Sequence, residues 1–486
     1  MADVEKIVAR FELICRTQPQ RPLVALPSLR TTMTAADIWQ QHHDYLAHLS
    51  RLDLHPGDLV VCGIGNRPEL LPVLLACRVM DLTLMALDTG ATAAEIRSLC
   101  VRFGARALLT SAPVVPGDGA AATVAPGLTL LRCEGRAIGY PGAAMLKLTS
   151  GSSGLPRATR MTETQLIADG SQIMAAMAIG PDDTQLAVIP LAHSYGLGVI
   201  VMPLLLQGTG IILRESFVPP HLPADAREFG ARRLPGVPFM FEHLIEHPPA
   251  GGWPDGLTKL VSAGARLSPS TVRAFHDKFG IKVHPFYGTT ETGGISYDDS
   301  ENAEAATTVG RPLGGVSVTL EPMSGLPPEL GRVHVRSGAV SDGYVGADPG
   351  DFTKGGFLTG DYGTVGDDGR LTLMGRISSF INVAGRKVQP DEVEAVLLSM
   401  PDIVDARVVG AVDAHRGQQV VACIVPRDGV PAPGPLQIRE FCSPRLAAHK
   451  LPRTVIVVPS IPLNARGKTD RAALEALVRR HIEGRP

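Results

Sequence analysis

From Leu59 onward, short apolar runs alternate with helical patterns, and this alternation limits the possible folds more than any other feature of the chain. Strand-like runs and helical patterns follow one another in residues 59–64, 67–80, 82–87, 92–103 and 107–109. Strands that alternate with helices predict βαβ units and a largely parallel sheet. The same alternation recurs across residues 165–290, so the predicted fold class is α/β.

The chain has 486 residues, which is too long for one compact core, and two or three domains are expected. Residues 309–375 are glycine-rich and strand-like, which predicts a β-rich subdomain. Helical and strand patterns begin again after residue 376 and indicate a compact α+β unit. We therefore predict a large domain over 1–376, including the β-rich subdomain, and a small C-terminal domain over 377–486.

Composition excludes several classes of protein. The net charge is −2 and there is no block of lysine or arginine, which argues against a nucleic-acid partner. The seven cysteines are scattered without a Cys-x-x-Cys pair, as expected for reduced thiols in a cytoplasmic protein. The most apolar stretch, 187–213, is interrupted by His193, Ser194, Tyr195 and Gln207, and it predicts a buried helix and strand rather than a membrane span.

Residues 149–157 form the most informative short segment. Glycines let a backbone curl around a ligand, successive backbone N–H groups can bind an anion, and an arginine can donate to phosphate oxygens. Composition alone leaves two equal interpretations, a loop that grips a nucleoside triphosphate and a flexible surface loop. The Walker A spacing is absent. The candidate phosphate-binding residues are Thr149, Ser150, Gly151, Ser152, Ser153, Gly154 and Arg157.

This segment resembles the phosphate-binding signature of the adenylate-forming superfamily, which includes acyl- and aryl-CoA synthetases, luciferases and peptide-synthetase adenylation domains. That signature is typically Thr-Ser-Gly-Thr-Thr-Gly-x-Pro-Lys. Arg157 stands where lysine is usual and keeps the positive charge. Further motifs follow in the family's order up to residue 471, so the resemblance covers most of the chain.

The second motif, residues 287–292, reads Tyr-Gly-Thr-Thr-Glu-Thr. The resemblance implies that Tyr287 stacks on adenine, that Gly288 and Thr289 adjoin the nucleotide, and that Thr290 contacts the α-phosphate and the substrate carboxylate. It assigns Mg²⁺ to Glu291, and a carboxylate suits a hard cation. The alternative is a hydrophilic loop that caps a helix.

Three weaker signals complete the predicted nucleotide site. Asp361 of Thr-Gly-Asp is expected to accept both ribose hydroxyls, although Gly-Asp pairs most often form turns. Arg376 is expected to hold the ribose or a phosphate. Gly264 and Ala265 match the segment beside the adenine, where small residues permit close backbone approach.

The C-terminal unit carries the remaining family elements. Residues 375–385 resemble the hinge, but Ser378 and Ser379 replace its acidic pair and Asn382 replaces a lysine. Gly385 is expected to serve the thiol step. Lys468, within residues 462–471, is expected to bridge the acyl carboxylate and the α-phosphate during adenylation.

Residues 190–198 resemble the segment that bounds the acyl pocket of acyl-CoA synthetases. His193 is expected to be a pocket wall or gate rather than a proton-transfer group. Amino-acid-activating relatives carry an aspartate for the substrate amine in a differently patterned segment, and residues 190–198 contain no such acid. The expected substrate is therefore an apolar aliphatic or aromatic carboxylic acid.

The resemblance implies an ATP- and Mg²⁺-dependent acid–thiol ligase with a mobile C-terminal domain. It would form acyl-AMP and pyrophosphate, and then transfer the acyl group to a thiol, for which coenzyme A is expected. One alternative is an adenylating enzyme that loads a carrier protein or a non-thiol acceptor. Another is a catalytically idle protein that binds acyl-AMP or nucleotide, which the departures at Arg157, Ser378 and Asn382 keep open.

Overall fold

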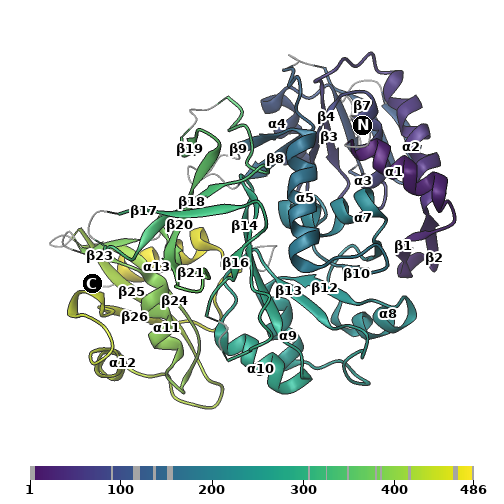
Figure 1. Cartoon of the computed structure of the whole chain (residues 1–486). Coiled ribbons are helices and arrows are strands. Elements are labelled where there is room, and N and C mark those ends of the chain that lie inside the picture. Colours follow the sequence, from purple (N-terminus) through teal and green to yellow (C-terminus); the bar gives the residue numbers. More distant parts are fainter. Residues whose placement is uncertain are drawn as a thin grey trace. The chain divides into compact units, whose positions relative to one another are not determined.

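The computed structural model describes most of the chain (Figure 1). The described residues are 6–88, 91–112, 121–134, 138–149, 157–304, 307–323, 326–346, 350–377, 380–383, 386–413, 417–463 and 469–483. Several predicted functional residues lie outside these ranges, namely residues 150–154, Ser378, Ser379, Gly385 and Lys468.

The chain divides into two compact units. The first contains residues 1–318, 335–358 and 369–371, and the second contains residues 319–334, 359–368 and 372–486. Both combine helices with sheets, so the predicted α/β class is confirmed. The domain limits expected at residues 376 and 377 stay a prediction.

One sheet of the first unit has nine strands. Its five inner pairings, from β14 to β1, are parallel, and antiparallel pairs close both edges. Parallel strands are usually buried on both faces by crossover helices. The strands in sheet order are β16 (Arg311–Pro312), β15 (Gly293–Tyr297), β14 (Val283–Thr289), β13 (Lys259–Ser262), β12 (Arg233–Gly236), β10 (Thr184–Ala187), β11 (Gly210–Leu213), β1 (Pro22–Leu26) and β2 (Thr31–Thr34).

The second sheet of this unit has seven strands, and the predicted strands near residues 59, 82 and 107 are confirmed within it. Parallel pairs join β5, β3, β4 and β8, and antiparallel pairs flank them. The strands in sheet order are β6 (Ala121–Ala125), β7 (Leu128–Arg132), β5 (Ala107–Thr110), β3 (Leu59–Gly63), β4 (Thr83–Ala86), β8 (Met145–Thr149) and β9 (Arg157–Met161).

The helices between these strands begin where the sequence provides caps. Thr34, Thr92 and Thr162 form capping boxes at α2, α4 and α5, and such a box satisfies two exposed N–H groups at once. Residues 187–213 fold into buried helical segments and β11, as predicted. The main helices are α1 (Ile7–Thr17), α2 (Ala35–Ser50), α3 (Leu70–Val79), α4 (Ala93–Phe103), α5 (Glu163–Met177), α6 (Ser194–Gly196), α7 (Met202–Gln207), α8 (Leu222–Glu228), α9 (Pro238–Glu246) and α10 (Pro269–Phe279).

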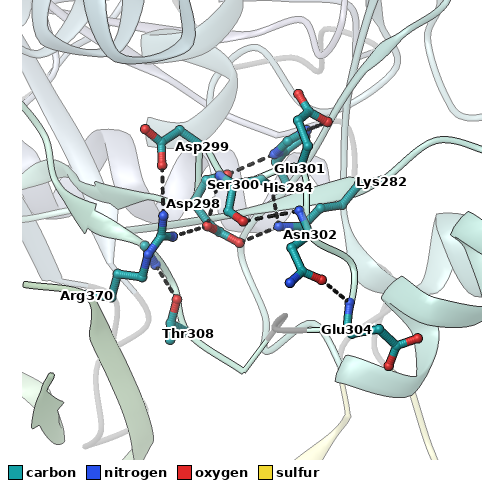
Figure 2. Close-up of polar contacts among 11 residues, drawn as sticks. Lys282, His284, Asp298, Asp299, Ser300, Glu301, Asn302, Glu304, Thr308 and Arg370 are labelled. Atoms are coloured by element: carbon teal, nitrogen blue, oxygen red, sulfur yellow. Dashed lines mark hydrogen bonds and ion pairs between the residues drawn. The ribbon is translucent and has the colours of Figure 1, made fainter. Parts of the chain in front are cut away.

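A buried charge cluster holds the base of the β14–β15 hairpin (Figure 2). Lys282 Nζ lies 2.7 Å from Asp298 Oδ2, and the two side chains are 1% and 2% exposed. Arg370 donates to the same carboxylate, and His284 Nδ1 donates to the Asp298 carbonyl at 2.8 Å. Because Lys282 precedes β14 and Asp298 follows β15, the cluster fixes the end of the hairpin opposite its turn.

The strands outside these two sheets form two groups. In the first, β17 (Ser317–Pro322) neighbours β18 (Gly331–Arg336), which neighbours β20 (Gly356–Val365), and β21 (Leu371–Arg376) pairs with β20. In the second, a core that includes Val393 and Ile424 lies between sheet and helices. Its elements are β22 (Ile381–Val383), β23 (Arg386–Val388), α11 (Pro390–Leu398), β24 (Ile403–Asp413), β25 (Gly417–Pro426), α12 (Pro435–Cys442), β26 (Thr454–Val457) and α13 (Arg471–Glu483).

Helix α11 begins at Pro390, with Gln389 at the N-cap. Across the described part of the chain, no helix combines the length and apolar character that crossing a membrane requires.

Candidate active site

The predicted phosphate loop joins two paired strands. Antiparallel β8 and β9 place Thr149 directly opposite Arg157, and Thr149 Oγ1 lies 3.5 Å from the Arg157 carbonyl. Both residues are half-buried. The strand pairing therefore holds Thr149 and Arg157, which flank residues 150–156 in the sequence, opposite each other.

Tyr344 connects the phosphate-loop cation to the predicted metal ligand. The Arg157 guanidinium lies over the Tyr344 ring, with its Cζ 3.5 Å from the ring centroid. The Tyr344 hydroxyl donates to Glu291 Oε1 at 2.7 Å. Arg157 and Glu291, which belong to motifs far apart in the sequence, therefore both contact the side chain of Tyr344.

The motif at residues 287–292 ends strand β14 and turns into β15. The alternative of a loop capping a helix is therefore wrong, because the motif forms the turn of a β-hairpin. Tyr287 is buried, and Thr289 Oγ1 lies 3.1 Å from Thr292 Oγ1. At Gly288 an added Cβ would lie 2.6 Å from the Gly293 carbonyl O, so only glycine allows this close backbone approach. Thr290 lies in the turn itself.

The predicted adenine segment lies at the matching edge of the neighbouring strand. Strands β13 and β14 run parallel with Ser262 opposite Pro285, so their carboxyl ends meet at one edge of the sheet, where ligands of α/β sheets usually bind. Gly264 follows β13 with a φ of +80°, and Gly264 and Ala265 are exposed.

A buried ion pair lies on the strand that leads into the phosphate loop. Lys147 Nζ on β8 lies 3.8 Å from Asp169 Oδ2 on α5, and both side chains are 2% exposed. Asp169 Oδ1 accepts from the Gly294 N–H at 2.9 Å. Burial lowers the pKa of Lys147, whereas the carboxylates of Asp169 and Glu291 raise it, and burial raises the pKa of Asp169. Lys147 Nζ has no hydrogen-bond partner among the described residues.

His193 pairs with an aspartate that the sequence did not single out. His193 Nε2 lies 3.0 Å from Asp88 Oδ2, with side chains 35% and 12% exposed. His193 sits at the N-cap of α6, and Asp88 follows β4. The carboxylate can fix the orientation and tautomer of the imidazole, which suits a positioned wall or gate.

In the second unit, Asp361 and Arg376 form an ion pair of 3.1 Å between Oδ1 and Nε. Asp361 is buried in the middle of β20, so the turn that Gly-Asp pairs usually form is not what this sequence adopts. The Asp361 N–H donates to Thr359 Oγ1 at 3.1 Å. A buried carboxylate on a regular strand has a fixed direction, as recognition of a ribose would require.

Sequence reasoning missed Tyr344, Lys147, Asp169 and Asp88. Two of them carried a readable signal. Lys147 interrupts the apolar run 143–148 just before the phosphate loop, and Tyr344 is an aromatic residue between glycines in residues 343–346. The roles of Asp169 and Asp88 depend on contacts with distant elements, which spacing does not reveal.

Comparison with known proteins identifies the family. Residues 141–345 match the family model for AMP-binding enzymes, and residues 392–468 match the model for the C-terminal domain of these enzymes. The chain belongs to the adenylate-forming superfamily. Within it, the chain is an AMP-forming acid–thiol ligase of the acyl-CoA synthetase type.

Its similarity to individual superfamily members extends over most of the chain. The sulfoacetate–CoA ligase of Cupriavidus necator is 30% identical over 68% of this chain and 66% of its own length. The oxalate–CoA ligase of Arabidopsis thaliana is 27% identical over 87% of this chain and 89% of its own length. The structure of ATP-bound MatB from Rhodopseudomonas palustris superposes with a TM-score of 0.83 at 23% identity, covering 97% and 98% of the two chains.

The residues present fit a nucleotide with its divalent cation. Glu291 keeps one carboxylate oxygen in the hydrogen bond from Tyr344, and its second oxygen is available as a ligand. Magnesium is usually bound by one or two carboxylates together with substrate phosphates, and one carboxylate beside a phosphate-loop cation matches that arrangement. Gly288, where a Cβ would strike backbone, adds a narrow cradle beside Tyr287.

Proposed function

We propose that this protein is a carboxylic acid–CoA ligase that uses ATP and Mg²⁺ to activate an apolar aliphatic or aromatic acid. The observation that carries the proposal is the contact series Arg157–Tyr344–Glu291. It joins a cation suited to phosphate and a carboxylate suited to a metal, although the two come from separate motifs. Binding of a metal–nucleotide complex would use both groups together.

In the first half-reaction, a carboxylate oxygen of the acid attacks the α-phosphorus of ATP. The new bond forms as the bond to the bridging oxygen breaks, and pyrophosphate leaves. Arg157 would neutralise phosphate charge and Thr290 would orient the α-phosphate, while Glu291 would hold the cation that neutralises the departing pyrophosphate. Positioning and charge stabilisation carry such transfers, so no protein nucleophile is required.

In the second half-reaction, the sulfur of coenzyme A attacks the carbonyl carbon of acyl-AMP. The thioester bond forms as the bond to the phosphate oxygen breaks, AMP leaves with the negative charge, and the proton of the thiol is released to solvent. We assign Asp361 to the ribose hydroxyls, because a carboxylate is an acceptor-only group. Arg376 would hold that carboxylate, and Lys468 and Gly385 would serve the adenylation and thiol steps respectively.

The segment that we assign to the acyl pocket carries apolar side chains. Its Leu191 and Leu197 are buried, and the ring of its Tyr195 lies 5.8 Å from that of Phe286. A pocket bounded by this segment would favour the apolar body of an acid and would disfavour a second charge, which would lose its hydration without compensation.

A panel of acids in a pyrophosphate-release assay tests the proposal. Benzoate-type and medium-chain acids should support pyrophosphate release. Oxalate and sulfoacetate, the acids in the names of two relatives, serve as doubly charged comparators. Coenzyme A should then accelerate AMP release. Pyrophosphate release with only the doubly charged acids would contradict the apolar substrate class. A rate of AMP release that does not change when coenzyme A is added would favour a carrier protein or a non-thiol acceptor. No release with any acid would favour an idle nucleotide-binding protein.

A further inference from the structure

We propose that Tyr344 is a positioning residue that sets both the metal carboxylate and the phosphate-loop cation. Its hydroxyl orients Glu291, and its ring face orients Arg157. This inference deepens the proposed function and rests on it, because it takes Glu291 as the metal ligand and Arg157 as the phosphate cation.

The backbone around Tyr344 is fixed on strand β9. Tyr344 forms an isolated antiparallel bridge with Thr159. The Arg160 N–H donates to the Gly343 carbonyl at 3.0 Å, and the Val345 N–H donates to the Ala158 carbonyl at 2.8 Å. Residues 343–345 therefore pair with β9 as a short additional strand. This pairing fixes the position of the backbone from which the Tyr344 side chain extends.

The same segment also holds the backbone of Glu291. The Ser341 N–H donates to the Glu291 carbonyl at 2.8 Å, so residues 341–345 contact both the main chain and the side chain of this glutamate. The hydrogen bond of 2.7 Å from the Tyr344 hydroxyl occupies Oε1. With that oxygen held, the rotation of the carboxylate is restricted and Oε2 is presented for a cation.

The ring face of Tyr344 acts on a second group. Arg157 Cζ lies 3.5 Å from the ring centroid, a distance at which the negative face of an aromatic ring attracts a guanidinium. Phe352 contacts the ring at 5.2 Å with an interplanar angle of 79°, which limits its movement. A guanidinium held over a fixed ring can still donate from its N–H groups to phosphate oxygens.

Two substitutions separate the two roles. Tyr344→Phe removes the hydroxyl and keeps the ring, whereas Tyr344→Leu removes both. The readout is equilibrium binding of ATP by calorimetry without any acid, repeated over a series of Mg²⁺ concentrations. Mg²⁺ should increase the affinity for ATP, and Tyr344→Phe should raise the Mg²⁺ concentration that gives half of this increase by about tenfold. The reason is that a hydrogen bond to a charged group is lost. Its metal-free ATP affinity should be parental.

Tyr344→Leu should show the same Mg²⁺ shift and, in addition, about threefold weaker metal-free ATP binding, because the cation–π contact is lost. In a Glu291→Gln background, Tyr344→Phe should cause no further Mg²⁺ shift, since both changes act through one carboxylate. Tyr140→Phe is the matched control: it removes a buried hydroxyl that donates to the Phe103 carbonyl at 2.8 Å, and its Mg²⁺ dependence should be parental.

The outcomes are distinguishable. Parental Mg²⁺ dependence in Tyr344→Phe, or an undiminished shift in the Glu291→Gln background, overturns the role of the hydroxyl. Equal metal-free affinities in Tyr344→Phe and Tyr344→Leu overturn the role of the ring. If Glu291→Gln alone shifts the Mg²⁺ dependence and Tyr344→Phe does not, only this inference fails. A parent protein that binds no ATP overturns the proposed function and the inference together.

Discussion

Lys147 and Asp169 form an ion pair of 3.8 Å in which both side chains are almost completely buried. Lys147 belongs to the strand that enters the phosphate loop, and Asp169 also accepts from the Gly294 N–H of the hairpin that carries Glu291. An added Cβ at Gly198 would lie 3.2 Å from Asp169 Oδ2, so the helical segment after His193 packs against the same carboxylate. One buried pair therefore joins β8, α5 and the β14–β15 hairpin.

Breaking this pair should destabilise the first unit strongly. Lys147→Met or Asp169→Asn alone leaves a buried group without its partner, which typically costs about 3–5 kcal/mol. The double variant Lys147→Met/Asp169→Asn should lose less free energy of unfolding than the sum of the losses in the two single variants. Both tryptophans, Trp39 and Trp253, belong to this unit, so urea unfolding followed by their fluorescence measures the effect. Additive losses would show that the charges do not act as a pair.

Arg157 should tolerate lysine better than alanine. Arg157→Lys keeps a positive charge near the phosphates, whereas Arg157→Ala removes it and should raise the KM for ATP in pyrophosphate release by about tenfold or more. Arg160→Ala is a matched control, because Arg160 lies three residues further along β9 and side chains alternate between the faces of a strand. An unchanged KM and kcat in Arg157→Ala would leave this cation without a role in ATP binding.

Lys468→Ala should impair one half-reaction only. Loss of one preorganised charge stabiliser commonly costs about 10²–10³ in rate, and the loss should appear in single-turnover formation of acyl-AMP. Thioester formation from supplied acyl-AMP should be nearly parental. Lys450→Ala, which removes a lysine bonded to Glu392 at 2.6 Å in the same unit, should leave both steps near the parental rates. A parental rate of acyl-AMP formation in Lys468→Ala would refute the assignment.

Glu394 should make the stability of the second unit depend on pH. Burial raises the pKa of Glu394 from 4.5 to about 7, although its carboxylate accepts from the Val408 N–H at 2.7 Å. Because the folded pKa is the higher one, this contribution to stability is complete below about pH 4.5 and is lost as the pH rises through about 7. The loss is at most on the order of 3 kcal/mol, reduced by the partial exposure of the side chain.

Hydrogen exchange of peptides from β24 and β25 measures this effect when parent and Glu394→Gln are compared at the same pH. The two proteins should be similarly protected at pH 5, and the variant should be better protected at pH 8. A difference in protection that does not change between these pH values would contradict the prediction.

Periodicity and turn residues were enough to predict part of the fold's elements. Apolar runs such as 59–64 and capped helices such as 92–103 are local signals, and the structure places β3 and α4 there. The Thr359–Asp361 segment was harder, because Gly-Asp favours turns. Here the pairing with a neighbouring strand outweighs the local preference for a turn. Strands β20 and β21 lie so close that an added Cβ at Gly363 would overlap the Thr372 carbonyl.

The motifs indicated which residues bear the chemistry but not how they are held. Tyr344 and Glu291 meet through a fold that brings residues 341–345 onto β9, and no short-range pattern encodes that contact. The Lys147–Asp169 pair is equally non-local. A charged residue inside an apolar run signals that a partner exists, but only the packing of α5 on the sheets identifies it.

Thr149 and Arg157 face each other across the β8–β9 pair, and this arrangement has a consequence for engineering. Residues 150–156 connect these two paired strand ends in sequence, so the segment can be varied between two constant strands. A library of variants confined to it would measure how much of the proposed triphosphate binding depends on this one segment.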